Sequence, residues 1–169
     1  MADSSVAILI RHYNPYGGGA ERYAVELTQR LARRYKVHVF AQTIEVQSPN
    51  ITFHTIPQWL QRPRYINQLL FSWLTRRATQ GKFDLVHSHD LVTHADLYTL
   101  HVPCFKTRWT ESRGWRRGLR WLNTLLSPRK IAYLWLEQRQ LSPRKGKQLI
   151  AVSEFLSRNI VRNYPQNSA

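Results

Sequence analysis

The sequence predicts an α/β fold: a single domain built on a doubly wound parallel sheet. Short apolar runs alternate with amphipathic helical segments along the chain, which is the order typical of parallel sheets. The first run, residues 6–10, has five consecutive apolar residues, as expected of a strand buried on both faces. With 169 residues, the chain is long enough to bury a substantial core.

The apolar runs and the helical periodicity place the elements along the chain. We expect strands at residues 6–10, 37–41, 51–56, 85–89, 97–101 and 149–152. We expect helices at residues 19–35, 65–80, 115–126, 131–141 and 154–163. Gly81 is expected to stop the second helix, and Ser153 is a good N-cap for the last one. The spacing predicts a buried stripe on the second helix formed by Ile66, Leu69, Leu70, Trp73 and Leu74.

A glycine-rich turn, Gly17-Gly18-Gly19, joins the first strand to the first helix. Helix N-terminal amides are unpaired and attract anions, and glycine lets a ligand approach the backbone closely. The turn does not match the G-x-G-x-x-G motif, so a phosphate site and a ligand-free flexible loop both stay open. The apolar positions of the helix that follows are Ala20, Tyr23, Ala24, Leu27 and Leu31.

Two further polar segments lie at the ends of predicted strands, and parallel sheets bind ligands at the carboxyl ends of their strands. We therefore expect the glycine turn, residues 87–90 and His101 to converge on one edge of the sheet. His101 can bond a hydroxyl or move a proton near neutral pH; the alternative is a packed histidine bonded to a backbone carbonyl. His87 and His89 alternate, which predicts that they face opposite sides of the strand. Asp90, beside the outward His89, could orient a histidine or bind a hydroxyl.

Several classes of site and segment are not expected. His87, His89, Asp90 and His94 match no zinc-ligand spacing, and the sequence has no Walker loop and no Gly-x-Ser-x-Gly elbow. The lone Cys104 allows no disulfide within the chain, which favours a reducing compartment, and packing is its expected role. No apolar run is long enough to span a membrane. No basic region precedes the first run, so we expect no signal peptide and a cytoplasmic location.

The charge is strongly basic, with 25 Lys and Arg against 10 Asp and Glu, a net charge of +15. Residues 106–147 hold 12 of the basic residues and two of the acidic ones, a net +10. Such a field attracts nucleic acid, anionic lipid or a phosphorylated substrate. Arginine and tryptophan on one helix suit a membrane interface, although a wet face beside a core stripe is the alternative. The candidate membrane- or anion-binding residues are Arg113, Arg116, Arg117, Arg120, Trp115 and Trp121.

Four motifs occur in order along nearly the whole chain. They are Gly18-Gly19-Ala20-Glu21-Arg22, Phe83-Asp84-Leu85-Val86-His87-Ser88-His89-Asp90, Thr99-Leu100-His101 and Ile150-Ala151-Val152-Ser153-Glu154-Phe155. Together they resemble the N-terminal, acceptor-binding domain of retaining GT-B glycosyltransferases of the group 1, glycogen-synthase-like family.

The resemblance implies a Rossmann-like half of a GT-B fold and assigns roles to its residues. The backbone at Gly18 and Gly19 would approach the phosphate of a nucleotide-sugar donor. His101 would be the catalytic residue, beside the transferred sugar. The acceptor-binding residues would be Asn14, Tyr16, His89 and Asp90. The resemblance implies no metal, because cationic side chains of a second domain bind the leaving phosphate, and no cofactor besides the donor substrate.

The resemblance also implies a second, C-terminal domain that binds the donor through two glutamates eight positions apart. That pair is missing here, so we expect residues 1–169 to form only the N-terminal domain and to be inactive alone. The missing domain would act in cis or in trans. The expected function is hexosyl transfer to a cell-envelope glycolipid or polysaccharide, such as lipopolysaccharide, at the inner face of the membrane. The alternatives are a nucleic-acid-binding module and a non-catalytic interaction subunit on the same scaffold.

Overall fold

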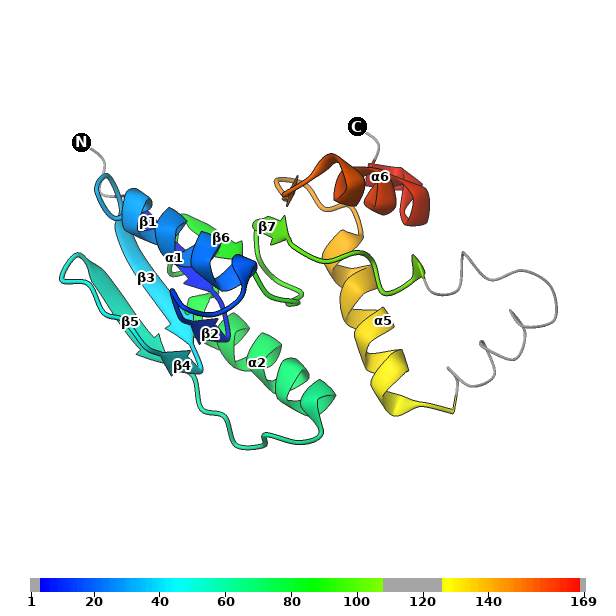
Figure 1. Cartoon of the computed structure of the whole chain (residues 1–169), viewed down its shortest axis with the longest axis horizontal. Coiled ribbons are helices and arrows are strands. Elements are labelled where there is room, and N and C mark those ends of the chain that lie inside the picture. The colour runs from blue at the N-terminus through cyan, green and yellow to red at the C-terminus, as the bar shows by residue number, and fades with distance from the viewer. Residues whose placement is uncertain (1–3, 108–125, 168–169) are drawn as a thin grey trace.

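The computed structural model describes residues 4–107 and 126–167 (Figure 1). Within them, a six-stranded sheet has the strand order β5-β3-β1-β6-β7-β8, and every pairing is parallel. Chain order runs outward from β1 to β5 on one side and from β6 to β8 on the other, so the order reverses between β1 and β6. The strands are β1 (Ser5–Leu9), β3 (Lys36–Ala41), β5 (Ile51–Thr55), β6 (Leu85–Ser88), β7 (Leu97–Leu100) and β8 (Gln148–Ala151).

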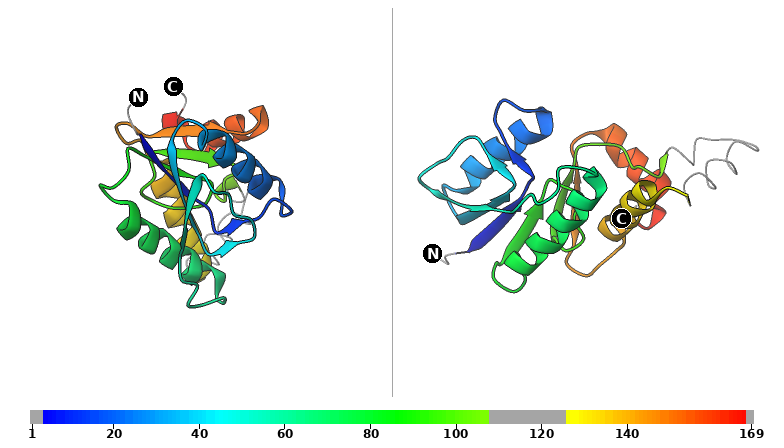
Figure 2. Two further views of the ribbon diagram at one scale, coloured as in Figure 1. Left: turned by 90° about the vertical axis from the view of Figure 1, so that its left-hand side faces the viewer. Right: turned by 90° about the horizontal axis from the view of Figure 1, so that it is seen from below.

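The helices cover both faces of this sheet, as two turned views show (Figure 2). The helices are α1 (Gly19–Leu31), α2 (Arg64–Thr79), α5 (Pro128–Leu141) and α6 (Glu154–Asn163), followed by a 3₁₀ turn at Pro165–Asn167. Helix α2 contacts α5, and α6 contacts β8. No helix among the described residues is long and apolar enough to cross a membrane. The fold is therefore the predicted doubly wound α/β sheet.

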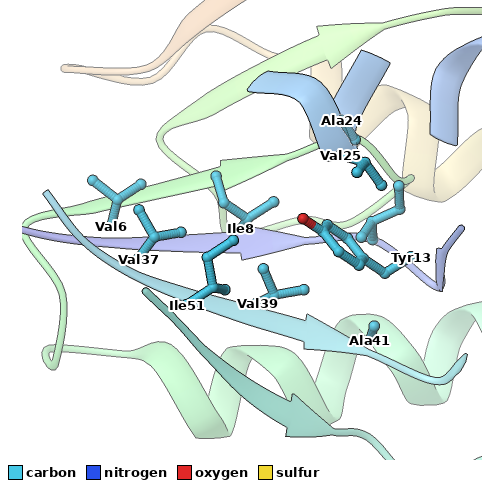
Figure 3. Packing of buried hydrophobic residues seen from close by; sticks show 10 residues of the cluster. Val6, Ile8, Tyr13, Ala24, Val25, Val37, Val39, Ala41 and Ile51 are labelled. Atoms are coloured by element: carbon cyan, nitrogen blue, oxygen red, sulfur yellow. The ribbon is translucent and has the colours of Figure 1, made fainter. Parts of the chain in front are cut away.

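Strand β1 is buried on both faces and divides the core in two. Val6 and Ile8 pack with Val25 of α1 on one face (Figure 3). Ala7 and Leu9 pack with Phe71 of α2 on the other face, in a second cluster. Because successive side chains of a strand point to opposite faces, an unbroken apolar run is what this central position requires.

The observed elements differ from the predicted ones mainly at their ends. The strands predicted to end at His89 and His101 end one residue earlier, at Ser88 and Leu100. Helix α1 ends at Leu31 rather than at residue 35, because residues 32–35 form turns that lead into β3. Two short paired strands, β2 (His12–Tyr13) and β4 (Thr43–Ile44), were not predicted. The helix expected at residues 115–126 falls almost wholly outside the described residues.

The predicted N-cap and helix stop are both present. The hydroxyl of Ser153 accepts a hydrogen bond from the backbone N–H of Leu156 at 3.3 Å, which caps α6 as expected. Gly81, two residues after α2, has a φ of 69°, a left-handed conformation that glycine adopts without steric cost. The N-cap and the helix stop could be predicted from the sequence because each depends on residues within one turn of the helix end.

The predicted buried stripe of α2 is wrong. Trp73 is 48% exposed, while the buried face is largely polar and consists of Asn67, Gln68, Phe71, Ser72, Thr75 and Thr79. The polar side chains are buried because they find partners: Gln68 donates to the carbonyl of Leu91 at 2.7 Å, and Thr75 donates to the carbonyl of Phe71 at 2.6 Å. Buried polar groups with partners avoid the desolvation penalty, so bonds within α2 and to the loop after β6 together allow this polar face to be buried.

Candidate active site

A cavity of about 370 Å³ opens at the carboxyl ends of the strands. Two of the three segments that were predicted to converge there contribute to its wall, the loop after β6 and the residues after β7. The glycine turn itself does not line the cavity, although Ala20 and Glu21, which follow it, do. Helix α5 also contributes to the wall, through Tyr133, Glu137, Gln140 and Leu141. The lining residues that carry chemistry are Arg11, Glu21, His89, Asp90, His101, Tyr133 and Glu137. The location agrees with the rule that ligands bind where the strand order of an open sheet reverses.

Three histidines form a cluster at this edge. The Nδ1 atom of His89 lies 3.3 Å from the Nε2 atom of His101, and Nε2 of His87 lies 2.8 Å from the Thr99 hydroxyl. The prediction that His87 and His89 face opposite sides is wrong, since their ring centroids are 4.4 Å apart. Strand β6 ends at Ser88, so His89 has left the alternating pleat. Of the two, only His89 lines the cavity.

Burial keeps these imidazoles neutral. It lowers the pKa of His89 to about 2, helped by the neighbouring His87 and His101. It lowers the pKa of His87 to about 4. Burial also lowers the pKa of His101, although the charges of Glu21 and Asp90 oppose the shift. Since an unperturbed histidine has a pKa of about 6.5, all three rings are uncharged at pH 7, and each carries one N–H.

The hydrogen-bond partners assign the ring protons. Nε2 of His89 is buried and has no partner among residues 4–107 and 126–167, and an unbonded buried N–H is rarer than an unbonded acceptor. We therefore assign the proton of His89 to Nδ1, where it is donated to Nε2 of His101. That assignment places the proton of His101 on Nδ1, as a donor for a ligand. The ring of Tyr23 meets both imidazoles edge-on, with centroids 5.9 and 5.5 Å away.

Asp90 binds an arginine rather than a histidine. One carboxylate oxygen accepts the backbone N–H of Arg11 at 2.8 Å, and the other accepts Nε of the same residue at 2.9 Å. The Ser88 hydroxyl donates to the carbonyl of Asp90 at 2.9 Å, which ties the loop after β6 to itself. These bonds fix Arg11 at the wall of the cavity. The hydroxyl-binding role of Asp90 stays a prediction.

The glycine turn meets the cavity through the residues that follow it. Gly18 is the N-cap of α1 and supplies no side chain to cap it. The acidic residue in the first turn is Glu21, whose Oε2 lies 2.8 Å from the position of a Cβ added at Gly18. Neither Gly18 nor Gly19 has a positive φ, and a Cβ added at Gly19 would meet no atom within 4 Å. The chain's own geometry therefore does not require glycine at residue 19, and open space lies beside its backbone. Ala20 and Glu21 line the cavity.

The other predicted acceptor residues lie outside the cavity wall. The side-chain oxygen of Asn14 accepts the backbone N–H of Tyr16 at 2.7 Å, and Tyr16 is 91% exposed. Both belong to the loop between β2 and α1, ahead of the glycines. Their role stays a prediction.

Glu137 of α5 holds the segment that follows His101. This role was not predicted from the sequence. Its carboxylate accepts the backbone N–H groups of Phe105 and Lys106 and the hydroxyl of Tyr164. Burial raises the pKa of Glu137, and these donors oppose the shift. One carboxylate thus ties the strand end that carries His101 to both α5 and the end of α6.

Cys104 lies in the same segment and is a packing residue, as expected. It is 7% exposed and packs with Leu141, Ile160 and Tyr164. Burial raises the pKa of its thiol to about 12, with a contribution from the charge of Glu137. The thiol is therefore protonated at neutral pH and a poor nucleophile.

The predicted membrane- or anion-binding residues lie outside the described residues. They are Arg113, Arg116, Arg117, Arg120, Trp115 and Trp121. Of residues 106–147, the structure describes 106–107 and 126–147. Some of the basic side chains there have internal partners: the Lys147 ammonium donates to the carbonyl of Gln140 at 2.8 Å. Within the described parts of the chain, no three His, Cys, Asp or Glu side chains form a group that could hold a metal ion.

An open parallel sheet whose strand order reverses beside a cavity at the carboxyl ends of its strands defines a Rossmann-like ligand-binding domain. The family model for Glycosyltransferase Family 4 matches residues 17–168, so the chain belongs to that family. No curated protein sequence matches the chain significantly.

A solved structure agrees with this fold. WaaG, a glycosyltransferase involved in lipopolysaccharide biosynthesis, matches with a TM-score of 0.79 at 18% identity, over 95% of this chain and 42% of that one. Sucrose-phosphate synthase (tll1590) from Thermosynechococcus elongatus matches with a TM-score of 0.47 at 15% identity, over 88% of this chain and 47% of that one. From the match to WaaG, the chain has the fold of the N-terminal half of a GT-B glycosyltransferase. It spans less than half the length of each of the two structures.

Proposed function

We propose that this chain is the acceptor-binding half of a retaining glycosyltransferase that uses a nucleotide sugar and acts on a cell-envelope glycolipid or polysaccharide. The observation that carries the proposal is the cavity in which His89, Asp90 and His101 meet the start of α1. Family membership supports sugar transfer as the reaction. The involvement of WaaG in lipopolysaccharide biosynthesis supports a cell-envelope acceptor. The donor-binding half would be a second domain, in cis or in trans, without which the chain transfers nothing.

The proposed chemistry uses neutral donors and a helix end. The acceptor would lie in the cavity, and the Nδ1–H of His101 would bond an oxygen of the transferred sugar. A neutral imidazole can donate there without adding a buried charge. The amino end of α1 would face the donor phosphate, where unpaired amides and the helix dipole favour an anion. Besides the donor substrate, the proposal needs neither cofactor nor metal.

Gly19→Ala tests the donor site. We expect the free energy of unfolding to change by less than ~0.5 kcal/mol, because the new methyl group meets no atom of the chain within 4 Å. In the protein that contains both halves, we expect the KM for the nucleotide sugar to rise about tenfold, which corresponds to ~1.4 kcal/mol of lost phosphate contact. The measurements are urea unfolding of the chain and steady-state kinetics of the complete enzyme.

Gly17→Ala is the matched control, because its methyl group would lie 3.2 Å from Cβ of Glu21, inside the turn. This variant is expected to lose stability and to keep its donor KM. An unchanged donor KM in Gly19→Ala would show that the donor phosphate does not lie against this turn.

We also propose that residues 106–147 hold the enzyme at the inner, anionic face of the membrane. The described part of this segment exposes Ile131 and Trp135, each by 46%, and the Arg139 guanidinium lies 5.9 Å from the ring centroid of Trp135. Exposed tryptophan and isoleucine beside cations are typical of an interfacial helix.

Sedimentation with lipid vesicles tests this docking. We expect the chain to sediment with anionic vesicles at low salt and to be released as salt rises, because the Debye length falls from about 10 Å at 0.1 M to about 3 Å at 1 M. Trp135→Ala should weaken the binding, with Tyr16→Ala as the control for loss of an exposed aromatic ring elsewhere. Equal binding to zwitterionic vesicles, or no binding to either kind, would contradict the proposal.

A further inference from the structure

A second hollow, whose lining includes four arginines, lies beside the cavity. Its two lobes share Arg62, Arg64 and Tyr133, and one lobe of about 850 Å³ also includes Arg129. The residues before and at the start of α2 form one side of this basic hollow, and α5 forms the other. The second lobe has Arg11, His12 and Tyr133 in common with the cavity. The basic hollow therefore continues directly from the site that holds His101.

Within the described residues, no carboxylate compensates the charge of the basic hollow. No carboxylate is found among its described lining residues. Arg62, Arg64 and Arg129 form no ion pair with any carboxylate in the described parts of the chain, and all three are exposed. Arg11, by contrast, is paired with Asp90. Three unpaired guanidinium groups around one hollow repel one another, so a bound anion would lower the electrostatic energy.

Two helix ends add to this positive field. Arg64 is the first residue of α2 and Arg129 the second residue of α5, and Figure 1 shows both helices beginning side by side at the lower edge. Neither helix has a side-chain cap or an acidic residue in its first turn. Helix amino ends normally favour acidic residues. Arginines there carry an electrostatic cost that a bound anion would remove.

We propose that the basic hollow binds a phosphate or pyrophosphate group of the acceptor, so that the enzyme acts on a phosphorylated glycan or glycolipid. The guanidinium group suits such a ligand because its planar donors bind two phosphate oxygens at once. The inference rests on the proposed function in one respect: the adjoining cavity must take the acceptor. The phosphate would then anchor the acceptor on the α2 and α5 side while its reacting sugar lies beside His101.

The direct test is calorimetric titration of the chain with inorganic pyrophosphate. We expect Arg62→Gln and Arg64→Gln each to weaken binding about tenfold, which is the effect of losing one charge-assisted contact, and the double variant to abolish it. Arg34→Gln, which removes the same charge from an exposed residue after α1, is the matched control and should bind nearly as well as the parent. Because the replaced side chains are exposed, loss of folding is not expected to confuse the result, and circular dichroism checks it.

A second arm identifies the carrier of the phosphate. The same variants are sedimented with phosphatidylglycerol and with phosphatidylcholine vesicles. If the variants bind pyrophosphate more weakly, the phosphate is recognised independently of a lipid surface. If the variants bind only phosphatidylglycerol vesicles more weakly, and pyrophosphate as the parent does, the phosphate belongs to a lipid. If the parent binds neither probe, or the double variant binds both as tightly as Arg34→Gln, the proposal is overturned.

Pyrophosphate binding also separates this inference from the proposed function. It requires no sugar transfer, and His101→Ala should bind the probe as the parent does. A complete enzyme that transfers sugar but shows no effect of Arg62 or Arg64 on the probe would refute the basic hollow alone. Normal probe binding without any transferase activity would refute the proposed function and leave the anion site in place.

Discussion

Replacing His101 by alanine is expected to lower sugar transfer by the complete enzyme about 100-fold or more, since positioned donors and proton carriers typically contribute 10²- to 10⁴-fold. His101 lines the cavity directly after β7, and its Nε2 is occupied by His89 at 3.3 Å. Its Nδ1–H is thus the atom left to act on the substrate. Steady-state kinetics should show the loss mainly in kcat if the bond forms in the transition state.

Two conservative variants test the assigned tautomer. The amide nitrogen of His101→Asn can lie near the position of Nδ1, whereas that of His101→Gln lies nearer Nε2. We therefore expect asparagine to retain more activity than glutamine, and glutamine to resemble alanine. Full activity in His101→Ala, with an unchanged melting temperature, would remove His101 from the chemistry. A better result for glutamine than for asparagine would reverse the proton assignment.

The sheet and the position of the cavity could be predicted because they depend on local signals. The apolar run of β1 marks a strand buried on both faces, and the polar residues that follow β1, β6 and β7 must meet at one edge of a parallel sheet. His89 and His101 were placed together in this way. The buried face of α2 could not be predicted, because the partners that allow Gln68 and Thr75 to be buried include a distant carbonyl, that of Leu91.

The residues that the sequence did not reveal act through distant contacts. Glu137 accepts hydrogen bonds from two backbone groups 31 and 32 positions away, and no periodicity reports such a pairing. One signal was present: Glu137 is one of only two acidic residues in 106–147, and an isolated acid in a basic segment suggests a fixed partner. Tyr23 was listed among the apolar positions of one face of α1, yet it is 40% exposed and lies against His89 and His101.

The second large effect is expected on acidification. Burial lowers the pKa of His87 and of His94 to about 4 and that of His89 to about 2, from 6.5 in the unfolded chain. Well above pH 6.5 these rings are neutral in both the folded and the unfolded chain, so the free energy of unfolding does not vary with pH through them. As the pH falls below 6.5, the histidines of the unfolded chain bind protons before those of the folded chain do. Each histidine therefore lowers the free energy of unfolding by up to ~1.4 kcal/mol for each unit by which the pH falls.

The three histidines together should lower the free energy of unfolding by about 4 kcal/mol per pH unit until the pH nears 4. Since domains are stable by about 5–15 kcal/mol, we expect urea unfolding midpoints to fall steeply between pH 6.5 and pH 5.

His94→Leu should remove about a third of this slope. It should cost no stability at pH 7, because both ring nitrogens of His94 are buried without partners and Arg76 and Arg144 disfavour its charge. His12→Gln, which removes an exposed imidazole, is the control. A flat midpoint from pH 7 to pH 5 would mean that the buried histidines take up protons in the folded chain, and the neutral donor assigned to His101 would then have to be abandoned as well.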